Sequence, residues 1–286
     1  MKFGILFANV GTYVQPDMAS TLGRIAEEHG IESLWAVEHV VVPADYQSEY
    51  PYSPTGRMPG PEESPIPDPL IWLTWVGAAT TSLRLATGIL ILPQRNPPIL
   101  AKELATLDVL SEGRVELGVG VGWLREEFDA LGVPFKERGA RTDEYIEALR
   151  CLWRDEEPCF EGRYTRFDRA KSYPKPAQGM IPVHVGGHTP AAARRAGLLG
   201  DGFFPGRTSD EDLGPLLDTM RASAKDAGRD ADAIEVTAGG IMDLDGVRRF
   251  ADAGVDRVVI PPLGWDPDTL QEQLGRFSEQ VIEKAG

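Results

Sequence analysis

The amino-acid sequence predicts an α/β fold, a single (β/α)₈ barrel that extends over residues 1–286. Short apolar runs occur eight times, segments with helical periodicity separate them, and most runs are continuously apolar instead of alternating. Apolar strands that alternate with helices indicate a parallel sheet covered by helices, and eight of them favour closure into a barrel. An open doubly wound sheet is the alternative, and length alone also permits two smaller domains.

The expected strands are short, and two of the helices between them have clear starts. The strands cover residues 3–8, 33–37, 85–92, 115–121, 181–185, 202–205, 234–238 and 257–260. Asp266 with Pro267, and Thr189 with Pro190, each place a capping side chain before a proline at the first helical position. Gly200 then predicts the end of the helix that begins at Pro190.

Two segments are longer than ordinary barrel loops. Residues 43–67 contain seven prolines and no helical period, and they follow the second strand at the end of the barrel where active sites lie. We expect a lid over the substrate, with an oligomer contact or a passive surface loop as alternatives. Residues 154–180 form a second excursion, before the fifth strand.

Composition limits the partners and the location of the protein. A formal net charge of -15 disfavours nucleic acids and anionic membranes as partners. No apolar run approaches the roughly 20 residues that cross a bilayer. The first residues are interpreted as a strand, because they lack the features of a signal peptide. We therefore expect a cytoplasmic protein that acts on a small molecule.

Several kinds of chemistry have no support in the sequence. Cys151 and Cys159 lie eight residues apart without a CxxC pattern, so we expect neither a disulfide framework nor a zinc site. There is no GxSxG, GxxxxGK[ST] or HExxH motif, and no other group of histidines and carboxylates with metal spacing. Hydrolase and metalloenzyme functions are disfavoured, and no metal is expected.

Glycines gather at the ends of the fourth and fifth expected strands. Gly120 and Gly122 belong to the string GVGVGW, where the lack of a Cβ atom would let a flat ring or a phosphate approach the backbone. A strand that needs small residues inside the barrel explains them equally well. Gly186 and Gly187 precede a helix start, which suits a phosphate because free amides and the helix dipole point towards it, with the Thr189 hydroxyl in reach. An ordinary turn with a capping threonine is the alternative.

Two further groups are candidates for the site. Gly206 and Arg207 follow the sixth strand, where the arginine could add a cation to the phosphate site or simply be an exposed loop residue. His39, preceded by Glu38, lies where the second strand ends. His39 could be a general acid, a group that polarises the hydride site or a core residue, and its position favours a catalytic role with Glu38 orienting it. His184, inside an apolar strand, is expected to be structural.

Two long segments of the chain resemble a known family. They are LRLATGILILPQRNPPILAKELATLDVLSEGRVELGVGVGWLREEF and VHVGGHTPAAARRAGLLGDGFFPG. Both closely resemble the luciferase-like monooxygenase superfamily, specifically its actinobacterial branch of coenzyme F420-dependent oxidoreductases. The resemblance extends over nearly the whole chain, including the proline-rich loop. It implies a bacterial luciferase-like barrel that binds a deazaflavin or FMN at the carboxyl ends of its strands.

The resemblance also implies which residues hold the cofactor. In relatives, a bulge on the third strand with a non-prolyl cis peptide supports the ring, and the matching step here is Gly88 to Ile89. By the same matching, the end of the fourth strand flanks the ring and ribityl chain, and the end of the fifth binds the phosphate. The resemblance implies Gly88, Ile89, Gly120, Val121, Gly122, Gly186, Gly187 and Thr189. The full set of expected cofactor-binding residues adds Thr87, Trp123, His188, Gly206 and Arg207.

Two departures from the family pattern bear on function. Trp123 stands where F420-dependent sugar-phosphate dehydrogenases have an acidic Glu, which disfavours that reaction. Val121 stands where bacterial luciferase has a phosphate-binding Arg, which favours F420 over FMN.

We therefore expect hydride transfer from C5 of reduced F420 to an activated alkene, a carbonyl or a quinone. The alternatives are an FMN-dependent monooxygenase and a non-catalytic protein that binds flavin or F420. Relatives are often dimers, so a homodimer is expected as well.

Overall fold

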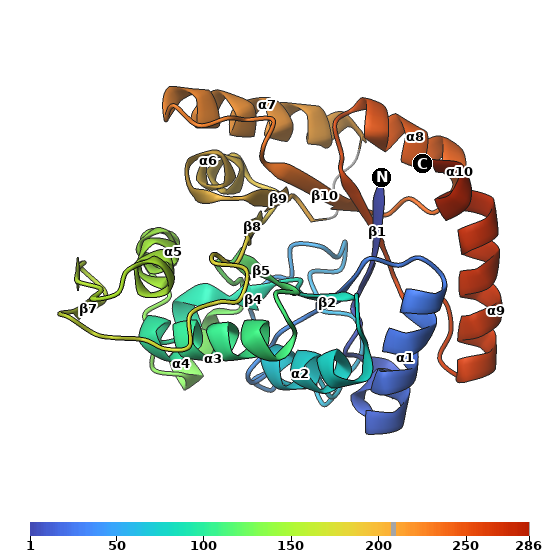
Figure 1. The fold of residues 1–286 in the computed structure, drawn as a ribbon, viewed down its shortest axis with the longest axis horizontal. Helices are drawn as coiled ribbons and strands as arrows, with labels where there is room; N and C mark the ends of the chain where they lie inside the picture. Colours follow the sequence, from blue (N-terminus) through green and yellow to red (C-terminus); the bar gives the residue numbers. More distant parts are fainter. Residues whose placement is uncertain (207–209, 286) are drawn as a thin grey trace.

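A computed structural model describes residues 1–206 and 210–285 and confirms the predicted barrel (Figure 1). Each of the eight expected positions holds a parallel strand, and helices surround the ring. The strands are β1 Lys2–Leu6, β2 Ser33–Ala36, β3 Arg84–Thr87, β4 Leu90–Ile91, β5 Val115–Gly120, β8 Val183–Gly186, β9 Gly202–Phe204, β10 Glu235–Gly239 and β11 Arg257–Ile260.

The third barrel strand is interrupted and accounts for both β3 and β4. The sheet order is β3-β2-β1-β11-β10-β9-β8-β5-β4, and β3 also pairs with β5, which closes the ring. Gly88 and Ile89 separate β3 from β4, and the peptide bond between them is cis, at the step that the family resemblance implies. The strand resumes against the same neighbour, with Leu90 opposite Val119.

The helices lie outside the ring (Figure 1). They are α1 Pro16–Glu28, α2 Pro69–Ala79, α3 Pro97–Leu110, α4 Arg125–Ala130, α5 Arg138–Arg154, α6 Pro190–Leu199, α7 Asp210–Asp226, α8 Leu244–Asp252, α9 Pro267–Phe277 and α10 Glu283–Ala285, with the shorter turns η1 Gly11–Val14, η2 Leu92–Gln94 and η3 Ser278–Ile282. The predicted caps are confirmed: Asp266 accepts from the Thr269 amide at 2.9 Å, and Thr189 accepts from the Ala192 amide at 3.2 Å. Among the described residues, no helix is long and apolar enough to cross a membrane.

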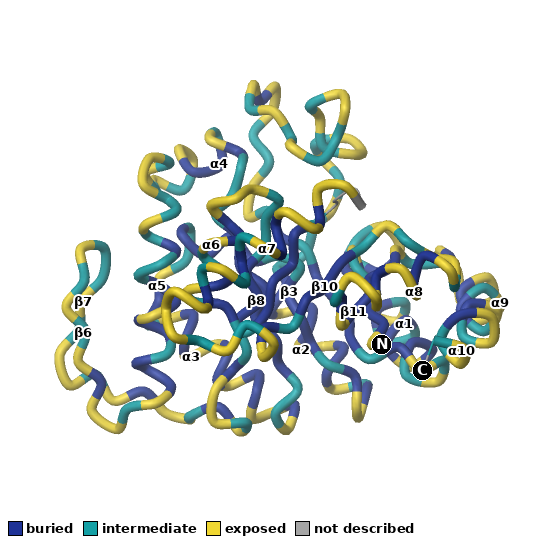
Figure 2. The backbone as a smooth tube through the Cα atoms, turned by 90° about the horizontal axis from the view of Figure 1, so that it is seen from above, coloured by how far each residue is buried: buried dark blue, intermediate teal, exposed yellow. Residues whose placement is uncertain are grey.

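Side chains fill the interior of the barrel. Trp35, Ala86, Phe204 and Val259 pack together there, with Ile89 against them. Figure 2 shows buried residues along the strands, whereas exposed residues follow the outer turns and the antiparallel hairpin of β6 (Phe160–Glu161) and β7 (Arg166–Phe167). This hairpin lies within the predicted excursion 154–180. Because the interior is packed, any binding site must lie at an end of the barrel.

A buried group of charges closes the amino-terminal end of the barrel. Arg257, the first residue of β11, is fully buried. Its guanidinium contacts carboxylate oxygens of Glu32 at 3.0 Å and Glu116 at 3.2 Å, and it also contacts Glu235. It lies 5.3 Å from the centre of the Trp35 ring, so it is attracted by the aromatic face as well. One cation therefore connects carboxylates that come from three parts of the sheet.

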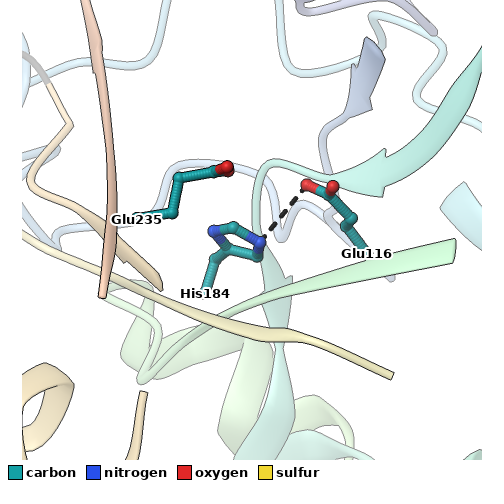
Figure 3. A group of neighbouring side chains, drawn as sticks. All are labelled: Glu116, His184 and Glu235. Atoms are coloured by element: carbon teal, nitrogen blue, oxygen red, sulfur yellow. Dashed lines mark ion pairs between the residues drawn. The ribbon is translucent and has the colours of Figure 1, made fainter. Parts of the chain in front are cut away.

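The same region has the residue types of a metal site. Ligand atoms of Glu116, His184 and Glu235 lie within 4.8 Å of one another (Figure 3). The guanidinium of Arg257 already contacts both carboxylates. A Cβ atom on Gly202 would lie 1.9 Å from His184 Nδ1, which means that this nitrogen faces the backbone of Gly202. Burial opposes ionisation of Glu116, but its contact with His184 and the charge of Arg257 hold its pKa well below the usual range. We interpret the cluster as an ion network in which Arg257 is the cation.

We predict that Arg257→Met lowers the free energy of unfolding by about 3 to 5 kcal/mol, because buried carboxylates lose their cation. Denaturant titration measures this change. Arg276→Met is the control, since Arg276 pairs with Glu272 on the exposed surface of α9 and its loss should cost less than about 1 kcal/mol. The double variant Arg257→Met/Glu116→Leu should recover part of the lost stability. An Arg257→Met protein as stable as the wild type would contradict this account.

Candidate functional site

The glycine-bearing strand ends lie side by side at the carboxyl end of the barrel. β5 and β8 are parallel neighbours, with Val119 opposite Val185. A Cβ atom on Gly120 would lie 2.1 Å from Ile89 Cδ1, and one on Gly186 would lie 2.7 Å from Ile89 Cγ2. Both glycines therefore make room for the bulge residue. This supports the packing explanation for Gly120, and it shows that the bulge and the two strand ends meet at one place.

The start of α6 presents groups that suit an anion. Gly187 adopts a positive φ of 129° and donates its amide to the Phe204 carbonyl at 3.0 Å, which joins it to the end of β9. His188 Nδ1 is buried and has no hydrogen-bond partner among the described residues, and the first amides of a helix have no partner within the helix. These groups fit a phosphate. Gly206 follows β9 nearby, whereas Arg207 lies outside the described residues.

His39 is paired with a carboxylate, but not with the predicted one. Its Nδ1 lies 3.0 Å from Oε2 of Glu127, which is fully buried on α4. Oε1 of Glu127 also accepts from the amide of Val40 at 2.7 Å and of Val41 at 3.3 Å. Glu127 therefore fixes both the ring of His39 and the backbone that follows it.

The prediction that Glu38 orients His39 is wrong. Glu38 accepts from the Ile91 amide at 2.5 Å and from Nε of Arg95 at 3.0 Å. Successive side chains of an extended segment point to opposite sides, which separates Glu38 from its neighbour. Arg95 also reaches Asp68 at 2.8 Å, and Asp68 caps α2. Glu38 thus connects the end of β2 to the third strand and to α2.

Aromatic rings form a row across the end of the barrel. Trp123 makes edge-to-face contacts with His39, Tyr46 and Tyr50, at ring-centre distances of 5.6, 5.5 and 5.2 Å. Tyr50 contacts Tyr52 at 5.5 Å, and Tyr52 contacts His188 at 4.9 Å. We call these six residues the aromatic row. It extends from the candidate catalytic histidine to the start of α6, and half of its members come from residues 43–67.

Residues 43–67, called the lid below, are held in place by polar contacts. Glu126 on α4 accepts from the amides of Gln47 and Ser48, at 2.7 and 3.1 Å, and from the Ser48 hydroxyl at 2.7 Å. The hydrogen bond from Ser48 and those from the amides lower the pKa of Glu126 to about 2. Arg57 lies over the ring of Tyr46, 4.6 Å from its centre. The lid is therefore anchored to α4 by hydrogen bonds to Glu126.

A cavity of about 250 Å³ remains beside His39. It is also lined by Gln94, Arg95 and Leu131. Both polar atoms of the Gln94 amide are buried without a partner in the part of the chain that the structure describes. A larger, mostly apolar hollow of about 640 Å³ lies between η1 and the start of α9, beside Trp265, and shares no lining residue with the first.

The lid, the aromatic row and the start of α6 lie together at the carboxyl end of the (β/α)₈ barrel, where barrels of this fold carry their binding sites. The sequence profile of the luciferase-like monooxygenase family matches residues 1–245. The chain belongs to this family.

Relatives in the curated collections agree with this assignment. An uncharacterised protein of Mycobacterium tuberculosis is 35% identical over 272 residues, which are 92% of this chain and 94% of that protein. An F420-dependent glucose-6-phosphate dehydrogenase of Nakamurella multipartita is 34% identical over 226 residues, which are 77% of this chain and 61% of the dehydrogenase.

Solved structures show the same fold. The monooxygenase RslO1 of Streptomyces bottropensis has a TM-score of 0.78 and 24% identity, with all of both chains covered. The coenzyme F420-dependent tetrahydromethanopterin reductase of Methanopyrus kandleri has a TM-score of 0.76 and 19% identity, over 100% of this chain and 99% of that one.

We predict that Glu126→Ala loosens the lid. Trypsin reports this opening, because Arg57 is the single trypsin target between residues 43 and 67. Loss of a charged acceptor should raise the cleavage rate roughly 10-fold. In the folded protein the pKa of Glu126 is lowered. Its contribution to the stability of the anchored lid is therefore fully present above its ordinary pKa of 4.5 and is lost as the pH falls towards 2. Asp129→Ala, an exposed carboxylate on the same helix, is the control. Equal cleavage of Glu126→Ala and wild type would contradict this prediction.

Proposed function

We propose that this protein is an F420-dependent oxidoreductase that transfers a hydride between C5 of the deazaflavin and a small organic acceptor, such as an activated alkene, a carbonyl or a quinone. The observation that carries the proposal is the meeting of the Gly88–Ile89 bulge, the ends of β5 and β8 and the start of α6 at one place. The similarity to F420-dependent dehydrogenases of Nakamurella multipartita and Kineococcus radiotolerans supports it.

The residues present fit such a cofactor. Ile89 and the ends of the flanking strands would support the ring, and the first amides of α6, with His188 and Thr189, would hold the phosphate. When bound, the reduced deazaflavin supplies a hydride. The closed lid limits the access of water to this region, which protects a hydride donor from side reactions.

His39 is proposed to hold and move the proton that balances the hydride. Its Nδ1 is engaged by Glu127 at 3.0 Å, which leaves Nε2 to exchange a proton with the acceptor. When a carbonyl accepts the hydride at carbon, its oxygen takes this proton, and the reverse holds for oxidation of an alcohol. The buried carboxylate of Glu127 orients the ring through Nδ1, so Glu127 is a positioning residue that acts through His39.

The acceptor is proposed to differ from the sugar phosphate of the curated relatives. Those dehydrogenases are said to act on glucose 6-phosphate, and this chain spans about three fifths of their length. Trp123 stands where the F420-dependent sugar-phosphate dehydrogenases have an acidic residue, and its ring is in contact with His39, Tyr46 and Tyr50. An indole cannot donate a proton as a carboxylic acid does, which supports a different substrate.

An FMN-dependent monooxygenase is the second candidate. A Baeyer–Villiger monooxygenase of Pseudomonas putida in complex with FMN has the same fold, with a TM-score of 0.74 and 17% identity. Val121 offers no charge to the phosphate monoester of FMN, which favours F420. A protein that binds either cofactor without turnover is the third alternative.

The first test is titration of the purified protein with F420 and with FMN, followed by fluorescence quenching. We expect saturable binding of F420 at lower concentration than of FMN. The phosphate site and the bulge can accommodate a deazaflavin, whereas position 121 has no arginine that would bind the phosphate of FMN. Consumption of oxygen with reduced FMN, and none with reduced F420, would select the monooxygenase. A protein that binds neither compound would end the proposal.

We predict that His39→Ala lowers turnover by about 10² to 10⁴-fold while the affinity for F420 changes little, since the loss concerns proton transfer. Steady-state rates across a panel of alkenes, carbonyls and quinones, together with the F420 titration, check this. His29→Ala is the control, because His29 ends α1 and contacts Gln271 at the outside of the barrel. Undiminished turnover in His39→Ala would remove His39 from the mechanism.

A further inference from the structure

Tyr52 is the lid residue that contacts the predicted phosphate site. Its ring packs edge to face on His188, with a ring-centre distance of 4.9 Å and an angle of 71° between the planes. It also covers Gly206, where a Cβ atom would lie 3.0 Å from Cε1 and 3.5 Å from the hydroxyl oxygen. The Tyr52 hydroxyl is therefore beside the two loops that end β8 and β9.

The other tyrosines of the lid are directed elsewhere. Tyr46 and Tyr50 contact Trp123, near His39, and the Tyr46 hydroxyl accepts from the Met58 amide at 2.9 Å. Tyr52 contacts Tyr50 at one edge and His188 at the other. Among the described lid residues, Tyr52 is thus the aromatic side chain that bridges the lid and the start of α6.

The chemistry of Tyr52 suits an anion as its partner. Burial and the neighbouring Tyr50 raise its pKa to about 12, so the phenol stays protonated over the whole working range of pH. A protonated phenol donates one hydrogen bond, and donation to a charged oxygen is stronger than donation to a neutral one. No hydrogen bond from this hydroxyl to another described residue is formed in the closed lid.

The charge of the whole protein makes such a donor useful. A net charge of -15 repels an anionic cofactor at long range, so the affinity must come from local donors. The start of α6 supplies amides, while Thr189 already accepts a hydrogen bond from Ala192 as the cap. Donors on the lid would add to this set only while the lid is closed.

We propose that Tyr52 donates a hydrogen bond to the phosphate group of the bound cofactor, so that phosphate binding and closure of the lid stabilise each other. The inference rests on the proposed function, because it takes the phosphorylated deazaflavin as the ligand. Linkage requires the effect to be mutual: a phosphate that binds the closed lid more tightly also favours closure by the same factor.

The test compares two ligands and three proteins. The ligands are F420 and the deazaflavin alcohol that lacks the phosphate and everything beyond it, and the proteins are wild type, Tyr52→Phe and Tyr50→Phe. Both variants keep the ring and lose one hydroxyl, and Tyr50 contacts Trp123 instead of His188. Dissociation constants come from fluorescence quenching, so no turnover is needed.

We expect Tyr52→Phe to bind F420 about 10 to 100-fold more weakly than wild type, as loss of a hydrogen bond to a charged group implies, and to bind the alcohol equally well. Tyr50→Phe should keep the wild-type ratio between the two ligands. F420 should also slow trypsin cleavage at Arg57 in wild type more than in Tyr52→Phe, and the alcohol should not distinguish them.

Two results would overturn the inference. Tyr52 acts only by packing if Tyr52→Phe binds F420 as tightly as wild type does, or if its affinity falls by the same factor for F420 and for the alcohol. If F420 gives no more protection of Arg57 in wild type than in Tyr52→Phe, lid closure is not linked to the phosphate. Failure of the wild type to bind F420 or FMN is a separate outcome, which removes the proposed function and this inference together.

Discussion

The packing of Ile89 between two glycines is the constraint on which the carboxyl end of the barrel depends. The third barrel strand leaves the sheet at Gly88 and returns at Leu90, and the side chain between them needs space on adjacent strands. Gly120 and Gly186 provide that space, since a Cβ atom on either would lie within 2.7 Å of an Ile89 carbon. The bulge, β5 and β8 therefore hold one another in register, and every candidate site residue on them takes its position from this contact.

The two ends of the barrel differ in the partners of their buried polar groups. At the amino-terminal end, Arg257 supplies a charge to the carboxylates around it, which balances groups that water cannot reach. At the carboxyl end, His188 Nδ1 and the amide of Gln94 are buried and have no partner in the described ranges 1–206 and 210–285. Leaving such groups unpaired costs about 1 to 3 kcal/mol each. Unpaired atoms of described residues also occur at the amino-terminal end, His184 Nδ1 among them, so the carboxyl end is distinguished by the cavity beside Gln94 that a polar ligand could enter, in agreement with the usual polarity of barrels.

Local patterns in the sequence were sufficient for the strands and for much of the helix framework. Apolar runs place all eight barrel strands, and the Asp266–Pro267 and Thr189–Pro190 pairs mark two helix starts, because these signals depend on neighbours in the chain. The partner of His39 could not be found this way. Glu127 lies 88 residues further on, and only the closed ring brings α4 to the end of β2. The contacts of Tyr52 could not be predicted from the sequence either. The lid has no periodic pattern, and the contacts of Tyr52 depend on how the lid folds over the barrel.

The surroundings of His39 also bear on which acceptors the proposed enzyme would use. The rings of Tyr46 and Tyr50 pack edge to face on Trp123, whereas the cavity beside His39 is lined by polar groups of Glu38, Asp68, Gln94 and Arg95. The Gln94 amide in that lining has no partner among the described residues, so it can pair with a polar group of an acceptor. A carbonyl or quinone presents an oxygen to such a group and needs one proton donor, which His39 can provide. Within the proposed function, the polarity of the cavity beside His39 therefore favours an acceptor that carries an oxygen, such as a carbonyl or a quinone.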